Sequence, residues 1–197
     1  MINHQTYIYP TDTVWGIGGS IYSEISYKEI ARIKNTTEDK PLSILFSTQE
    51  ELFTYFKFPN SISSSWLKDF FSFESSLLLP LQFQKKEIPS WIFQGSSFVS
   101  VRCLDFPIIH DLVKALNSPI TTTSLNKTGF SPIASFEEAK LFYEQNCPQV
   151  NFVMGKEMSL SGNSSTMISL DDSGQFKMIR NGLYARELSK LCGLSST

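Results

Sequence analysis

Short apolar segments alternate with amphipathic ones along most of the 197-residue chain. The apolar segments are rich in β-branched and aromatic residues, which indicates strands, whereas the amphipathic ones repeat apolar residues at helical spacing. Helices alternating with strands, and several strands late in the chain, favour an α/β fold with a mixed sheet. We find no internal repeat and no linker, so residues 1–197 are predicted to form a single domain. Strands are expected at 6–9, 42–46, 97–104, 119–126, 149–154, 165–170 and 176–180, helices at 22–35, 48–56, 106–117, 135–146 and within the last twelve residues, and a helix, a loop and a strand in 61–83.

Composition excludes several classes of protein. The net charge of −2 gives no strong overall field for nucleic acid, although a local basic patch remains compatible with it. The three cysteines lie far apart without a CxxC pair, which argues against a disulfide framework or a thiolate zinc site and is typical of a reducing cytoplasm. We expect no signal peptide and no transmembrane helix, since no apolar run reaches about 18 residues.

Polar residues gather where several predicted strands end. Small hydroxyls, glycine or a cation follow strands in the segments 10–19, 100–102, 121–129, 162–170 and 178–182. Ligands bind at the carboxyl ends of strands in open α/β sheets, and such groups suit a phosphate or a carboxylate. In PTDTVWGIGG (10–19), the glycines Gly16, Gly18 and Gly19 are expected to let the backbone approach an anion to which Thr11 and Thr13 donate.

Other interpretations of these residues stay open or are excluded. The segment 10–19 could instead form a turn in which Asp12 caps a helix. The chain has no GxxxxGK[ST] loop, and GIGG is not GxGxxG, so the common phosphate loops are absent. Ser124 lies outside a GxSxG elbow, which argues against a serine hydrolase. His110 falls within a predicted helix and is expected to be an ordinary surface or core histidine.

The order of these segments resembles the YrdC family of threonylcarbamoyl-AMP synthases. The segments are YPTDTVWGIG, a helix ending in IK, KPLSILFS, SVR, TTTSLNKTG, STMISL and MIRNG, and together they span about residues 7 to 183. The resemblance implies a twisted, mostly parallel mixed sheet flanked by helices, with a concave face for the ligand. It also implies a reaction in which L-threonine, bicarbonate and ATP with Mg²⁺ give threonylcarbamoyl-adenylate and pyrophosphate. The product would pass to a separate transferase complex that modifies adenosine 37 of tRNA.

The resemblance also implies roles for nine residues and names no metal ligand among them. Lys34, Lys40 and Arg102 are expected to be catalytic. Thr13, Thr122 and Ser165 are expected to bind threonine. Lys34, Lys40, Ser124, Asn126 and Arg180 are expected to bind the nucleotide. Hydroxyls and cations suit a reaction that needs positioning and charge neutralisation rather than a covalent enzyme intermediate.

The chain departs from the family pattern at five places. Thr36 replaces the arginine of KxR, and threonine cannot supply a guanidinium fork. The other departures are SFESSLLLPLQF in place of a proline-glycine-proline segment, Cys103-Leu104 after Arg102, Leu125 between Ser124 and Asn126, and Ser169 in place of an aspartate. An alternative is therefore a catalytically weakened YrdC-like protein that binds a nucleotide or RNA, including tRNA or double-stranded RNA. A third interpretation is an unrelated sugar-phosphate or nucleotide enzyme on a similar sheet.

Overall fold

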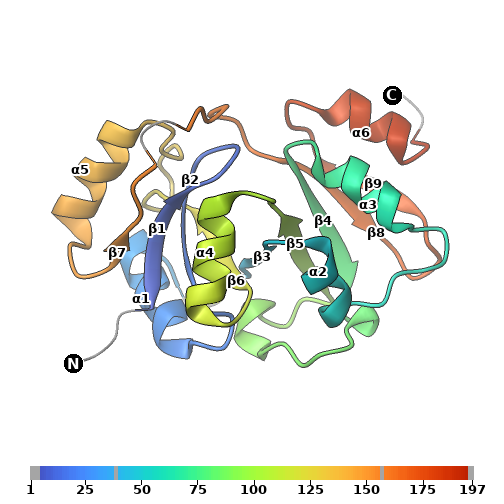
Figure 1. The fold of residues 1–197 in the computed structure, drawn as a ribbon, viewed down its shortest axis with the longest axis horizontal. Helices are drawn as coiled ribbons and strands as arrows, with labels where there is room; N and C mark the ends of the chain where they lie inside the picture. The colour runs from blue at the N-terminus through green and yellow to red at the C-terminus, as the bar shows by residue number, and fades with distance from the viewer. Residues whose placement is uncertain (1–4, 38–39, 156–157, 195–197) are drawn as a thin grey trace.

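The fold is built around one continuous nine-stranded sheet (Figure 1). The structure is a computed structural model and describes residues 5–37, 40–155 and 158–194. The strand order is β7-β1-β2-β6-β3-β5-β4-β8-β9. The strands are β1 (Thr6–Pro10), β2 (Trp15–Gly19), β3 (Ser43–Phe46), β4 (Ser75–Pro80), β5 (Phe98–Cys103), β6 (Ile120–Ser124), β7 (Asn151–Phe152), β8 (Thr166–Leu170) and β9 (Phe176–Arg180). The helices are α1 (Glu24–Lys34), α2 (Gln49–Tyr55), α3 (Ser64–Phe71), α4 (Pro107–Leu116), α5 (Phe136–Asn146) and α6 (Ala185–Leu191), with 3-10 turns at Leu81–Phe83 and Ser90–Ile92.

The sheet confirms the predicted α/β class and its mixed character, but parallel pairs do not dominate it. Among the described strands, β1–β7, β3–β5 and β4–β8 pair in parallel. The five other pairs, β1–β2, β2–β6, β3–β6, β4–β5 and β8–β9, are antiparallel. The expectation of a mostly parallel sheet is therefore wrong. Two of the antiparallel pairs, β1–β2 and β8–β9, are hairpins, and the other three join strands linked by longer connections.

Local capping signals set the helix ends close to where the sequence predicts them. Ser23 accepts a hydrogen bond from the backbone N–H of Ser26 at the start of α1, and Asn35 ends the helix in the left-handed conformation. Ser135 caps α5, because its hydroxyl accepts from the backbone N–H of Glu138 at 3.2 Å, the first bond of a capping box. The same hydroxyl donates to the Glu138 carboxylate at 3.0 Å. The helices predicted at 22–35 and 135–146 are therefore confirmed.

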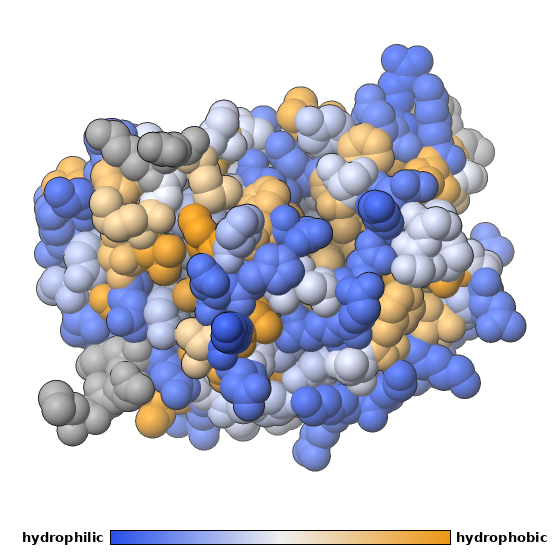
Figure 2. All heavy atoms as spheres, viewed as in Figure 1, coloured by the Kyte–Doolittle hydropathy of each residue, from blue (hydrophilic) through white to orange (hydrophobic). Residues whose placement is uncertain are grey.

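Three apolar clusters hold the helices to the sheet. The largest joins α2, α3 and α6 to the half of the sheet around β4, β5 and β8. A second packs α1 and α5 near the β1–β2 end, and a third seats α4 in front of the sheet (Figure 1). Seen from the same side, hydrophilic side chains cover much of the surface and apolar ones show between them (Figure 2). None of the helices in the described part of the chain is long and apolar enough to cross a bilayer.

The glycine-rich segment forms a buried strand rather than an anion-binding loop. Residues 15–19 are β2, whose register with β1 pairs Gly16 with Tyr9 and Gly18 with Tyr7. A Cβ atom on Gly18 would lie 1.8 Å from the carbonyl oxygen of Thr121 on β6. Gly18 and Gly19 are therefore needed for close packing, and the expectation that these two approach an anion is wrong, whereas Gly16 lines a polar pocket. No helix follows Asp12, so its suggested role as a helix cap is also wrong.

We expect Gly18→Ala to lower the free energy of unfolding by about 2–3 kcal/mol, because the new methyl group meets rigid backbone. Gly16→Ala is the matched control on the same strand. Its Cβ would lie 3.2 Å from the ring of Tyr9, a contact that a shift of only a few tenths of an ångström would relieve, so we expect less than half of that loss. Urea unfolding of both variants measures the difference. Equal losses would contradict the assignment of Gly18 to a backbone contact.

Candidate functional site

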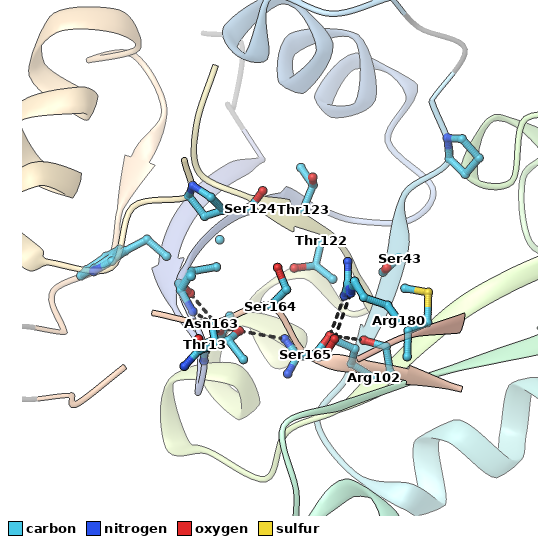
Figure 3. Close-up of a pocket in the computed structure, with 18 residues that line it drawn as sticks. Thr13, Ser43, Arg102, Thr122, Thr123, Ser124, Asn163, Ser164, Ser165 and Arg180 are labelled. Carbon is cyan, nitrogen blue, oxygen red and sulfur yellow. Dashed lines mark hydrogen bonds between the residues drawn. The ribbon is translucent and has the colours of Figure 1, made fainter. Parts of the chain in front are cut away.

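A polar pocket of about 200 Å³ opens where the β1–β2 turn, the ends of β6 and β8, and the arginines of β5 and β9 converge (Figure 3). Neither a carboxylate nor a lysine is among the described residues that line it. Its polar lining consists of two guanidinium groups, one amide and nine hydroxyls, from Arg102, Arg180, Asn163, Thr11, Thr13, Ser43, Ser76, Thr122, Thr123, Ser124, Ser164 and Ser165. Such a lining suits an anionic ligand of the phosphate or carboxylate class.

Arg102 is the best-anchored cation of the pocket. Its Nη2 donates to both oxygens of Asp12, at 2.7 and 2.9 Å, and its Nε donates to the carbonyl oxygen of Ser75 at 3.1 Å. The two charged side chains are 9% and 15% exposed, so this ion pair is largely withdrawn from solvent. The Nη1 group donates to Thr13 Oγ1 at 3.4 Å, which connects the guanidinium to the pocket wall.

Two distant parts of the chain are joined across the mouth of the pocket. The backbone N–H of Ser161 donates to the carbonyl oxygen of Asp12 at 3.2 Å, and that of Gly162 donates to Thr13 at 2.8 Å. These bonds hold the loop that carries Asn163 against the β1–β2 turn. The β1–β2 turn and the loop that carries Asn163, which lie about 150 residues apart in the sequence, therefore form one wall of the pocket.

Arg180 faces the pocket from the end of β9. Its Nε donates to the carbonyl oxygen of Ser165 at 3.0 Å, and its Nη2 donates to the Ser165 hydroxyl at 3.0 Å. Burial, and then the positive charge of Arg102, lower the pKa of Arg180 below its ordinary value. No ion pair to Arg180 occurs in the part of the chain that the structure describes, whereas Arg102 is paired with the carboxylate of Asp12. The pocket consequently carries excess positive charge.

Lys34 lies beside this pocket rather than in its lining. Its ammonium group donates to the backbone oxygen of Ser124, and to the backbone oxygen and Oδ1 of Asn126 at 3.1 and 2.9 Å. The Ser124 hydroxyl also donates to Asn126 Oδ1 at 2.7 Å. Burial, and then the charge of Lys40, lower the pKa of Lys34 to about 8. Lys34, Thr36 and exposed Lys40 line a neighbouring cavity of about 100 Å³ with an apolar floor.

This lowered pKa makes stability depend on pH. Between about pH 8 and pH 10.5, Lys34 is protonated in the unfolded chain but largely neutral in the folded one. The unfolded state then binds more protons, so the contribution of Lys34 to the free energy of unfolding rises with pH, by up to about 1.4 kcal/mol per pH unit. In urea unfolding, we expect the free energy of unfolding of the wild type minus that of Lys34→Met to rise with pH across this window. The exposed lysine variant Lys127→Met should show no such trend, and a flat difference for Lys34→Met would contradict the assignment.

The structure brings together six of the expected site residues and leaves three outside the pocket. Thr13, Arg102, Thr122, Ser124, Ser165 and Arg180 line it. Lys34 and Asn126 reach it through Ser124, and Lys40 lies at the neighbouring cavity. Sequence reasoning missed Ser76, whose hydroxyl lies 2.8 Å from that of Ser165, because a pair of serines before an apolar run carries no signal of its own.

The departures from the family pattern lie mostly outside the pocket. Leu125 is fully buried in the cluster of α1 and α5, so its bulk does not enter the ligand space. Cys103 and Leu104 are buried in other apolar clusters, and Ser169 donates to the backbone of Lys177. Two departures line a cavity: Thr36 lies beside Lys34, and Ser76, in the segment that stands in place of proline-glycine-proline, lines the pocket.

Sequence comparisons give two related findings. The sequence model of the Sua5/YciO/YrdC family, described as telomere recombination, matches residues 3–182. A threonylcarbamoyl-AMP synthase from Pseudoalteromonas atlantica is 26% identical over 157 residues, which cover 80% of this chain and 83% of the relative. A synthase of the same name from Acinetobacter baylyi is 25% identical over 155 residues, covering 77% and 81%.

Two solved structures share the fold. Sua5 from P. abyssi, complexed with L-threonine, superposes with a TM-score of 0.80 at 25% identity and covers 96% of this chain. The chain spans about half of that protein, since the match covers 54% of it. YciO from E. coli superposes with a TM-score of 0.73 at 24% identity, covering 91% of this chain and 84% of its own.

Proposed function

Because this chain belongs to the Sua5/YciO/YrdC family, we propose that it is a threonylcarbamoyl-AMP synthase, which joins L-threonine, bicarbonate and ATP and releases pyrophosphate. The relatives that carry this name match most of the chain, which supports the proposal. The observation that carries it is the pocket lined by Arg102, which is paired with Asp12, by Arg180, which has no ion pair among the described residues, and by hydroxyl groups. Such a lining suits a carboxylate and phosphates bound at the same time.

The proposed reaction has two steps without a covalent bond to the protein. The amine of threonine adds to the carbon of CO₂, formed from bicarbonate with loss of water, and gives up a proton to become a carbamate. A carbamate oxygen then attacks the α-phosphorus of ATP, the bond to the bridging oxygen breaks, and pyrophosphate leaves. In this proposal Arg102 and Arg180 neutralise charge, while Thr13, Thr122 and Ser165 position the amino acid.

The nucleotide would extend from the pocket toward the cavity beside Lys34. Ser124 and Asn126 connect the two spaces, and Lys34 and Lys40 supply positive charge at the second one. The apolar floor of that cavity, from Tyr27, Ile30 and Leu42, suits a planar base. We therefore propose that phosphates lie near the lysines, with their α-phosphorus directed into the main pocket.

Mg²⁺ would enter with ATP rather than occupy a site built by the protein. In the described ranges, no cluster of three or more histidine, cysteine or acidic residues could hold a metal, and the pocket lining contains no carboxylate. Mg²⁺ binds readily through phosphate oxygens and water. We propose that it neutralises the triphosphate charge, while the chain's own residues orient the reacting groups.

The further steps outside the protein are also proposals. The product would pass to a separate transferase complex for tRNA modification, and the protein would act in the cytoplasm, where ATP and tRNA occur together. Contact with tRNA or double-stranded RNA stays a prediction, since the net charge of −2 gives no general attraction to nucleic acid. The catalytically weakened alternative rests on Thr36, which places no charge beside Lys34 where the family has arginine.

Pyrophosphate release tests the proposed function. The purified protein is incubated with ATP, Mg²⁺, bicarbonate and L-threonine, and threonine or bicarbonate is omitted in parallel reactions. We expect release that requires both. ATP binding by calorimetry without release under any of these conditions would overturn the synthase and favour the nucleotide-binding alternative.

A further inference from the structure

Two hydroxyls of the pocket, those of Thr122 and Thr13, have the direction of their hydrogen bonds fixed by the neighbouring residues Tyr9 and Thr11. We propose that Tyr9 and Thr11 act as positioning residues that make Thr122 a donor and Thr13 an acceptor, and so orient the amino-acid substrate. Thr122 then donates to the carboxylate of the amino acid, and Thr13 accepts from its amine. This inference rests on the proposed function, since it concerns the amino acid that the synthase would bind.

Tyr9 fixes the direction at Thr122. Its side chain is fully buried, and its hydroxyl donates to Thr122 Oγ1 at 2.9 Å. The other acceptor in reach, the carbonyl oxygen of Thr121, is 3.5 Å away, at the limit for a hydrogen bond. Burial raises the pKa of the Tyr9 hydroxyl well above its ordinary value, so it stays a donor throughout the neutral range.

A hydroxyl that accepts from Tyr9 keeps its own hydrogen for another partner. Thr122 lines the pocket and is 7% exposed. No acceptor for the Thr122 hydroxyl is found among the described residues, so its hydrogen is available to a ligand in the pocket. A donor at this position suits a carboxylate oxygen and disfavours an ammonium group.

Thr11 fixes the opposite direction at Thr13. Thr11 Oγ1 donates to the carbonyl oxygen of Val14 at 2.7 Å, which commits its single hydrogen. Thr11 Oγ1 also accepts from the backbone N–H groups of Thr13 and Val14, at 3.2 and 3.3 Å, so with its hydrogen committed it acts only as an acceptor. In its 3.0 Å contact with Thr13 Oγ1, Thr13 is then the donor. Thr13 also receives the Nη1 hydrogen of Arg102 at 3.4 Å, so it offers a ligand only a lone pair. On this inference neither Thr11 nor Thr13 has a hydroxyl hydrogen left for an anion, in contrast to the expectation from the sequence.

The two directions together distinguish the ends of an amino acid. Figure 3 draws Thr13 and Thr122 on different sides of the pocket, each labelled. A reversed amino acid would set a carboxylate against the lone pair of Thr13 and an amine against the hydrogen of Thr122. Each mismatched buried bond lowers affinity about 5–150-fold, which is enough to select one orientation.

A double-mutant cycle on Tyr9 and Thr122 tests the inference. Tyr9→Phe removes one oxygen without leaving a cavity for a side chain, and Thr122→Val removes the hydroxyl at almost constant volume. We expect Tyr9→Phe to raise the KM for L-threonine about 3–10-fold with kcat changed less than about twofold, the size of one hydrogen bond. We expect Thr122→Val to raise KM further, and the double variant to match Thr122→Val alone, because Tyr9 acts through that hydroxyl.

The controls separate this inference from a structural role and from the proposed function. Tyr7→Phe alters a half-buried tyrosine on the same strand, outside the pocket, and should leave KM unchanged. Threonine affinity by calorimetry repeats the cycle without turnover, so an enzyme that binds threonine but releases no pyrophosphate would reject the synthase and not this inference. L-Threoninol, which lacks the carboxylate, should bind wild type more weakly than L-threonine and lose less affinity on Tyr9→Phe.

Three results would overturn the inference. The first is additive effects of Tyr9→Phe and Thr122→Val, which would mean that Tyr9 acts elsewhere. The second is an equal loss of affinity for L-threonine and L-threoninol in Tyr9→Phe, which would mean that Thr122 does not bind the carboxylate of the amino acid. The third is a wild-type protein that binds ATP but shows no affinity for L-threonine.

Discussion

Replacing Arg102 with methionine should lower the kcat/KM of pyrophosphate release by about 10²–10³-fold. The Arg102 guanidinium is held by Asp12, Thr13 and the backbone of Ser75, so it is already oriented before a ligand enters. A charged donor that is fixed in a buried site loses little free energy to reorganisation, which is why its removal is costly. Pyrophosphate release at varied threonine and ATP concentrations gives the value.

Two further arginine variants show whether the loss of activity in Arg102→Met comes from the missing guanidinium group. Arg102→Lys keeps the charge but lacks the planar fork that contacts Asp12 and Ser75 together, so we expect it to recover only part of the activity. Arg186→Met removes an exposed arginine on α6 and should leave activity unchanged. Activity of Arg102→Met within about threefold of wild type would mean that the proposed catalytic centre lies elsewhere.

Asp12→Asn should lower the free energy of unfolding by about 3 kcal/mol. The substitution keeps the shape of the side chain but leaves the guanidinium of Arg102 without its countercharge, in a position where that side chain is only 9% exposed. A buried charge that loses its partner is among the most destabilising changes that a single substitution can make. Urea unfolding monitored by circular dichroism gives the difference.

A surface ion pair supplies the matched control. Asp105 pairs with His110 at 2.6 Å, but the side chain of Asp105 is 89% exposed. Asp105→Asn should therefore cost less than about 1 kcal/mol. Similar losses for the two variants would show that the Asp12–Arg102 pair is effectively solvated.

The double variant Asp12→Asn/Arg102→Met separates stability from activity. Neutral side chains in place of a buried ion pair often restore stability, because neither charge then remains uncompensated. We expect the double variant to unfold close to wild type while its activity stays as low as that of Arg102→Met. Recovery of both properties would mean that Arg102 serves the fold alone.

Sequence reasoning succeeds where the signal is local. Ser23 and Asn35 mark the ends of α1, and Ser135 with Glu138 marks the start of α5, because capping groups act within a few residues of the helix end. The polar residues near strand ends also indicated a site that includes Arg102 and Thr122, which the pocket confirms. The reason differs from the expected one, because β5 and β6 run in opposite directions and their carboxyl ends do not meet at one edge.

It fails where the deciding partner is distant in sequence. The contact of Gly18 with the backbone of Thr121, and the ion pair of Asp12 with Arg102, join residues about 90 to 100 positions apart. The sequence around Gly16, Gly18 and Gly19, with its neighbouring hydroxyl residues, predicts a loop, because no nearby residue indicates that β6 packs against these glycines. Strand direction is likewise set by the route of each connection, which explains why antiparallel pairs outnumber the expected parallel ones.

The backbone bonds from Ser161 and Gly162 to the β1–β2 turn have a consequence for synthesis on the ribosome. The turn emerges early, yet its partner loop and Arg180 follow about 150 residues later, so closing the pocket carries the entropy cost of a very long loop. Contacts of such sequence separation form late in folding. A nascent chain can therefore build much of its sheet before it can hold a ligand, and binding becomes a signal that this last loop has been synthesised and folded into place.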